Sequence, residues 1–263
     1  MYLLNGWVGF KKEVKRMDKV LNLQVSFFGS FRNIRLETEI VIDLLTALKD
    51  DGFVPGSVDI ASVDLKTGNM NVDSRIQMIS PDKTWVIVFL PDRIDFNYNY
   101  QIGTTEHKHI DNLLVYIKKL VEKVFSVFKS TIGNRLALNC KLVLENMTED
   151  DLKQFCGRFT NPLSAYNGDS YAEWSVLFNA RGRFRISEVE TEECNRITEM
   201  TQVEDQNGLI DETNISHSII LSMDVNTIPS NNVQRFKYNH LLCFANDVAQ
   251  FVNEVMKEIE GNY

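Results

Sequence analysis

From position 110 to position 128 the chain reads IDNLLVYIKKLVEKVFSVF. Apolar residues recur here every three or four positions, a spacing that predicts an amphipathic helix with one broad apolar face. A second stretch of this kind runs from Asn232 to Ile259. A helix with such a face must cover an apolar surface, so we expect each of these two helices to lie on a sheet.

An alternating segment begins each half of the chain. Apolar residues recur at every second position in 21–27 and in 136–144, as in strands with one buried face. A short helix should follow each of these strands, at 36–48 in the first half and, from the capping box of Thr148 and Asp151, at 148–155 in the second. Four further strands are expected in each half, at 58–63, 76–79, 85–90, 94–100, 174–178, 184–189, 197–203 and 218–225, with a turn at 179–182.

The matched order of these elements predicts an α+β fold with an internally duplicated β-α-β4-α unit. Antiparallel sheets, each packed by a long helix, are the expected arrangement, and a single fused sheet is the alternative. The corresponding division of the chain is an N-terminal extension at 1–16, a first α+β repeat at 17–131 and a second α+β repeat at 132–263.

Composition excludes several classes of protein. Hydrophobic residues make up 44% of the chain, enough for a core, yet no segment approaches the roughly 20 consecutive apolar residues of a membrane helix. We therefore expect no membrane partner. The four cysteines, at 140, 156, 194 and 243, are too far apart for a zinc or redox motif, so unpaired thiols in a reducing cytoplasm are expected.

Acidic residues dominate the second half and give the chain a net charge of −8. Between 188 and 212 only Arg196 offsets them. We predict an acidic face that docks the basic surface of another protein, and the alternative is a solvated, charged sheet edge. Such a surface repels phosphate, so nucleic acid is an unlikely partner. The residues assigned to this face are Glu188, Glu190, Glu192, Glu193, Glu204 and Asp205.

Motifs that carry catalysis are scarce. The chain contains no Gly-x-Ser-x-Gly elbow, phosphate-binding glycine loop or His-Glu-x-x-His motif. Glu106, His107 and His109 could share a metal, but their place at the start of a helix favours a structural role. Asp92 after Pro91, with Glu106 and Lys108, matches in letters a metal-dependent nuclease pattern, although the required strand context is missing. We predict no enzyme, no metal site and no cofactor, with a nuclease as the third candidate.

A hydrophobic-ligand carrier is the second candidate. Tyr98, Tyr100, Trp174 and Phe178 would lie on concave sheet faces if each long helix gripped a curved sheet around a cavity. Aromatic residues on the inner face of a sheet more commonly form its core.

Three segments carry a resemblance to known proteins. The run from Arg75 to Ile94, the sequence Ile132-Gly-Asn-Arg-Leu136 and the last helix with His240 are similar to a sporadically distributed family of uncharacterised bacterial proteins. The patchy distribution of that family implies an accessory role in a bacterial defence or toxin system. The predicted function is therefore a non-enzymatic protein-interaction module.

Overall fold

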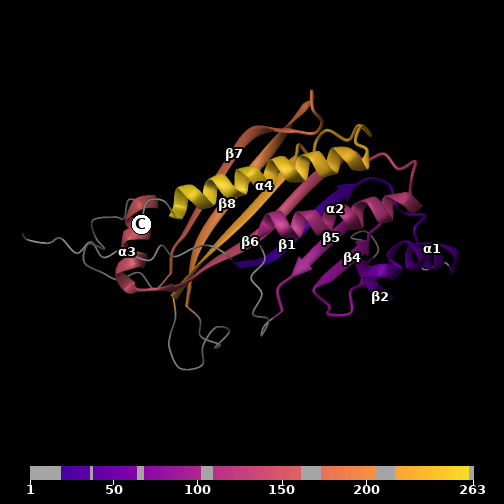
Figure 1. The fold of residues 1–263 in the computed structure, drawn as a ribbon, viewed down its shortest axis with the longest axis horizontal. Helices are drawn as coiled ribbons and strands as arrows, with labels where there is room; N and C mark the ends of the chain where they lie inside the picture. Colours follow the sequence, from indigo (N-terminus) through magenta and orange to yellow (C-terminus); the bar gives the residue numbers. More distant parts are fainter. Residues whose placement is uncertain are drawn as a thin grey trace, which may run out of the picture.

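A single antiparallel sheet organises the molecule (Figure 1). The structure is a computed structural model that describes residues 19–35, 38–63, 68–101, 109–160, 173–204 and 217–260. Within these residues the sheet has nine strands in the order β2-β3-β4-β5-β1-β6-β9-β8-β7. The strands are β1 (Lys19–Phe28), β2 (Val54–Val63), β3 (Met70–Ile79), β4 (Trp85–Phe89), β5 (Arg93–Asn99), β6 (Arg135–Met147), β7 (Ser175–Arg185), β8 (Thr191–Glu204) and β9 (His217–Thr227).

The expectation of separate sheets, each packed by its own long helix, is wrong. β1 pairs with β5 on one side and with β6 on the other, so the strands of both halves belong to one sheet. On β1, Leu23 and Val25 lie opposite Cys140 and Leu138 of β6, and all four side chains are buried. The apolar face therefore continues across the junction, and separating β1 from β6 would expose it to water.

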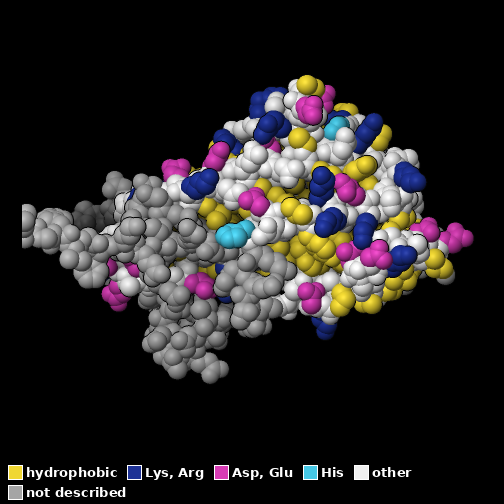
Figure 2. All heavy atoms as spheres, viewed as in Figure 1, with side chains coloured by type: hydrophobic (Ala, Val, Ile, Leu, Met, Phe, Trp, Pro, Cys, Tyr) yellow, Lys and Arg dark blue, Asp and Glu magenta, His cyan; other side chains and the backbone are white. Residues whose placement is uncertain are grey.

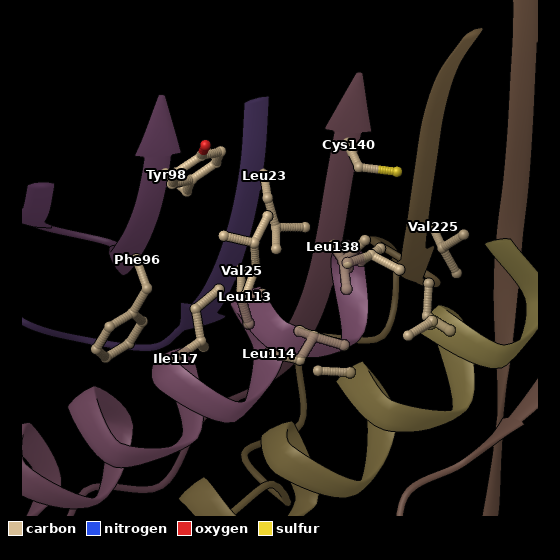
Figure 3. Packing of buried hydrophobic residues seen from close by; sticks show 14 of the residues in the cluster. Leu23, Val25, Phe96, Tyr98, Leu113, Leu114, Ile117, Leu138, Cys140 and Val225 are labelled. Carbon is tan, nitrogen blue, oxygen red and sulfur yellow. The ribbon is translucent and has the colours of Figure 1, made fainter. Parts of the chain in front are cut away.

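Two long helices cover this face side by side (Figure 1). They are α2 (Ile110–Val127) and α4 (Tyr238–Glu260). Figure 3 shows Leu113, Leu114 and Ile117 of α2 beneath strand side chains of β5, β1, β6 and β9. Two shorter helices, α1 (Thr38–Leu48) and α3 (Glu149–Phe159), lie toward opposite ends of the molecule in Figure 1. The capping box predicted for α3 is confirmed, because Thr148 and Asp151 bond reciprocally at its start.

The second half is not a copy of the β-α-β4-α unit. β7 runs without interruption through residues 179–182, where a turn was expected. In the described part of the chain, three strands therefore follow α3 instead of four. At Gly182 a Cβ atom would lie 2.6 Å from Nε of Arg196, so the glycine makes room for a side chain from the neighbouring strand and does not reverse the chain. Division into repeats at 17–131 and 132–263 stays a prediction, and residues 1–16 lie outside the described part.

Gly133 lies between β1 and the segment before α4, in a space too small for a side chain. Its N–H donates to the carbonyl of Phe236 at 2.7 Å, and its own carbonyl accepts from the N–H groups of Arg235 and Phe236. A Cβ at this position would lie 2.5 Å from the carbonyl oxygen of Phe28 and 2.6 Å from the ring of Phe27. Backbone atoms on both sides fix this approach, so a side chain could be accommodated only by moving β1 or the segment before α4.

We expect Gly133→Ala to lower the free energy of unfolding by about 1–3 kcal/mol, the usual cost of overpacking. Urea unfolding followed by circular dichroism measures it. The matched control is Gly157→Ala on α3. Apart from the backbone of its own helix, no atom of the described residues lies within 4 Å of the added Cβ, and alanine favours the helix by roughly 0.5–1 kcal/mol. Equal urea midpoints for Gly133→Ala and the wild type would show that the junction is not tight.

Candidate functional site

The hairpin of β7 and β8 forms one edge of the sheet. We call residues 175–204 the edge hairpin. β7 pairs with β8 in unbroken register from Ser175 opposite Thr201 to Arg185 opposite Thr191. Among the described strands β7 has no partner on its other side, and most of its residues are exposed, including Leu177 and Phe178. A long and regular edge of this kind presents unpaired backbone N–H and C=O groups.

Three arginines alternate along this edge strand. Arg181 forms an ion pair with Glu193 at 3.4 Å, and Arg183 donates to the hydroxyl and the carbonyl of Thr191. Arg185 reaches across to α4, where its Nε lies 2.7 Å from a carboxylate oxygen of Asp247. Arg181 and Arg183 are exposed and their partners lie on the hairpin itself, so their contacts contribute little to stability and can be exchanged for contacts with another molecule at small cost. Asp247 is largely buried and also accepts a hydrogen bond from the backbone N–H of Arg185, so Arg185 is tied to α4.

The predicted acidic residues do not form one face. Glu188 and Glu190 are exposed in the turn of the edge hairpin, and Glu193 is exposed near the start of β8. Glu204 lies at the opposite end of β8, where its backbone pairs with His217, and Asp205 lies outside the described residues. At the tip of the hairpin, uppermost in Figure 1, Figure 2 shows basic and acidic side chains close together. The surface therefore has mixed charge.

Glu192 has a structural partner. Its carboxylate oxygens lie 2.9 and 3.5 Å from nitrogens of Arg235, and both side chains are about four-fifths buried, with exposed fractions of 19% and 20%. The same guanidinium donates to the carbonyls of Asn134, Asn231 and Val233 and lies 4.2 Å from the ring centre of Phe236. Glu192 thus orients the arginine that holds the segment before α4.

The sequence analysis missed the arginines of β7. The turn expected at 179–182 placed Arg181 and Arg183 on different elements and hid their alternation on one strand. The signal that could have found them is the spacing Arg181-x-Arg183-x-Arg185, which puts three charges on the same face of a strand. On the neighbouring strand Glu193 lies opposite Arg183, so basic and acidic side chains face each other across the hairpin.

The residues of the nuclease and metal hypotheses are not brought together within the described part. Asp92 is an exposed turn residue whose carboxylate lies 3.9 Å from Arg93, and His109 is the exposed N-cap of α2. Glu106, His107 and Lys108 lie outside the described residues. Among those that are described, no group of three or more His, Cys, Asp or Glu side chains could hold a metal ion.

The four aromatic residues of the ligand hypothesis lie apart. Tyr98 is buried against Trp85, with ring centres 5.2 Å apart, and Tyr100 receives the ammonium group of Lys19 over its ring. Trp174 stacks on Phe155 of α3 at 5.6 Å, whereas Phe178 is half exposed on β7. These side chains come from opposite halves of the sheet and do not converge on a common space.

The cysteines are free thiols, and three of the four are buried. Burial raises the pKa of Cys140 to about 12, and burial together with the charge of Glu192 raises the pKa of Cys194 to about 12. A thiol with so high a pKa is protonated at neutral pH and is a poor nucleophile.

Comparisons with known proteins add no relative. No protein-family model matches the chain, and no curated protein matches it. The resemblance to the bacterial family therefore stays a prediction. In the described part of the chain, none of the helices is both long and apolar enough to cross a membrane.

Glu192 and Glu190 provide a matched pair for separating structure from binding. We expect Glu192→Gln to lower the free energy of unfolding by about 1–3 kcal/mol, because a part-buried charged hydrogen bond to Arg235 is weakened. Glu190→Gln, on the exposed turn, should stay within about 0.5 kcal/mol of the wild type. Urea unfolding of both variants measures the difference, and equal stabilities would remove the structural role assigned to Glu192.

Proposed function

We propose that this protein is a non-enzymatic protein-interaction module that docks its partner on the edge hairpin. The observation that supports this proposal is β7, an edge strand of 11 residues with an exposed surface and no irregularity in its pairing. An extended segment of another protein can add to such an edge as a further strand, with affinity from main-chain hydrogen bonds and specificity from the side chains beside it.

The opposite edge of the sheet is less suited to strand addition. β2 contains Pro55, which lacks an N–H group, followed by Gly56. Proline on an edge strand is a common device against unwanted pairing. Between Ser175 and Arg185 the chain contains no proline. The two edges therefore differ in the availability of their backbone groups, and β7 is the more accessible.

Charge indicates which segment would fit. Two copies of the protein paired through β7 would bring their arginine rows together, and this repulsion disfavours self-association. An added strand with Asp or Glu beside Arg181 and Arg183 would gain cross-strand attraction instead. Glu188 and Glu190 in the turn would face basic groups on the surface of the same partner. Nucleic acid is disfavoured as a partner by the net charge of −8.

We place the protein in the cytoplasm, since its four thiols are unpaired and such thiols are typical of reducing compartments. The family resemblance supports an accessory role in a bacterial defence or toxin system.

Proline substitution tests docking on β7 directly. In an antiparallel ladder, alternate residues turn their N–H groups toward the neighbouring strand and away from it, so one of two adjacent residues has an outward N–H. We make both Asn179→Pro and Ala180→Pro. The variant whose lost N–H pointed toward β8 should have a melting temperature well below that of the wild type, and the variant whose lost N–H pointed outward should have a melting temperature close to it. The stable variant should bind the partner at least tenfold more weakly. Calorimetric titration measures this with the protein that copurifies from the native host.

Matched proline variants on β2, Ser57→Pro and Val58→Pro, provide the control. The one that keeps the wild-type melting temperature should also keep the wild-type Kd. The charge proposal is tested separately by Arg181→Glu with Arg183→Glu, which should weaken binding about tenfold at low salt and less at high salt. Lys141→Glu, an exposed substitution on β6, is its control. Wild-type affinity in both the stable β7 proline variant and the double arginine variant would show that the partner docks elsewhere.

A further inference from the structure

The backbone of β7 alternates between groups bonded to β8 and groups directed away from it. The N–H of Gln202 donates to the carbonyl of Trp174 at 3.0 Å, and the N–H of Ile186 donates to that of Glu190 at 3.0 Å. Both pairs continue the unbroken register of the two strands. In an antiparallel pair, bonded residues occur at every second position. The even-numbered residues of β7 are therefore bonded to β8, and the odd-numbered residues from Ser175 to Arg185 direct their N–H and C=O groups outward.

At Arg185 this outward edge is covered by α4. The N–H of Arg185 donates to Oδ2 of Asp247 at 2.9 Å, and its guanidinium donates to Oδ1 of the same carboxylate at 2.7 Å and to Gln250 at 3.2 Å. Phe184 packs on Phe244 of α4, so the side chain of Arg185 starts on the other face of β7 and passes round the free edge to reach the helix. We call these contacts the Arg185–Asp247 clasp. A further strand cannot pair at Arg185 while the clasp is closed.

The outward groups before the clasp are open, with one exception. Arg196 of β8 donates to the carbonyl of Arg181 at 3.4 Å, which is a long hydrogen bond. The outward N–H groups of Leu177, Asn179 and Arg183 meet no acceptor among the described residues. The open part of the edge therefore ends just before the clasp.

The two faces of this open edge differ in chemistry. Arg181 and Arg183 lie on the face away from α4, whereas Phe178, 48% exposed, lies on the other. Side chains on the same face of adjacent strands are neighbours, so an added strand would meet the arginines on one face and the Phe178 ring on the other. Glu193 pairs with Arg181 but lies one strand further from the edge, and Arg183 bonds to the uncharged Thr191. The nearest charges to an added strand are thus positive.

We propose that the partner pairs with Leu177–Arg183 through an extended segment that carries Asp or Glu on one face and apolar side chains on the other. This inference rests on the proposed function and adds to it the pattern of the segment and the point where its pairing ends. Acidic side chains two positions apart would lie beside Arg181 and Arg183, and the residues that alternate with them would face Phe178. The Arg185–Asp247 clasp limits the pairing to the residues before it.

Amide hydrogen exchange of the free protein, followed by NMR, tests the alternation and the clasp. We expect the outward N–H groups of Asn179 and Arg183 to be protected at least tenfold less than the inward N–H of Ala180, because only the inward group is bonded. The N–H of Arg185 should be protected as well as that of Ala180, and Asp247→Ala should remove this protection. Equal protection of Arg183 and Arg185 in the wild type would overturn the clasp.

Three synthetic heptapeptides, acetylated and amidated at their ends, test the chemistry of the segment. One alternates Glu with Val, one alternates Lys with Val, and one alternates Glu with Ser. In titrations of the ¹⁵N-labelled protein, the glutamate–valine peptide should shift the β7 amides along a saturating curve, at least tenfold tighter than the other two. The net charge of −8 favours the lysine peptide at long range, so the expected preference would come from the arginines of β7.

A pair of variants on the edge hairpin tests the apolar face. Phe178→Ala should weaken binding of the glutamate–valine peptide several-fold. Val189→Ala removes an exposed apolar side chain from the turn of the same hairpin and should leave binding unchanged.

Failure of this inference and failure of the proposed function are distinct results. If the lysine peptide binds as tightly as the glutamate–valine peptide, or if none of the three shifts the β7 amides, the proposed pattern is wrong. The docking site itself would still stand if Asn179→Pro, which removes an outward N–H, weakens binding of the partner that copurifies from the native host. Wild-type affinity of Asn179→Pro for that partner would instead contradict docking on β7.

Discussion

The pairing of β1 with β6 is the interaction on which the remaining structure depends. Each of these strands has its own half of the sheet on one side, β5 beside β1 and β9 beside β6, and the other half on the other side. If each half folded separately around its own long helix, β1 and β6 would become edge strands. The buried side chains of Leu23 and Leu138 would then be exposed to water. The pairing removes two interior edges at once, and among the described strands it leaves β2 and β7 as the outer edges.

A continuous sheet with both long helices on one face has a consequence for the other face. Residues that alternate with the core positions of β1 and β5, such as Asn22, Asn97 and Asn99, are polar and half-buried. Some of them bond to each other across the strands, as Asn22 does with Asn99 at 2.8 Å. Asparagine has low strand propensity, and no described helix packs on these side chains. The asparagines of β1 and β5 thus lie on the face of the sheet opposite the long helices, and the arginine row lies at the β7 edge.

The sequence predicted individual elements better than their association. The stripe in 110–128 corresponds to α2, and the alternation in 21–27 corresponds to the buried positions of β1, because side-chain periodicity is a local property of helix and strand. Strand pairing joins residues more than a hundred positions apart, as in Leu23 with Cys140, and periodicity carries no information on it. The error at 179–182 has a local cause, since Gly182 resembles a turn residue yet accommodates Arg196.

The candidate site shows the same limit for charged residues. Glu192 and Glu193 are adjacent in sequence, but their side chains lie on opposite faces of β8, so one meets Arg235 and the other Arg181. Arginines differ in the same way. The fully buried guanidinium of Arg75 donates to the carbonyl of Ile34 and pairs with Asp73, and that of Arg235 binds three carbonyls and Glu192. Each of these two arginines fixes a loop of the chain. Arg135 lies on β6 with Asp224 and Asp92 near its guanidinium, and its Nε, like that of Arg75, is buried without a hydrogen-bond partner among the described residues.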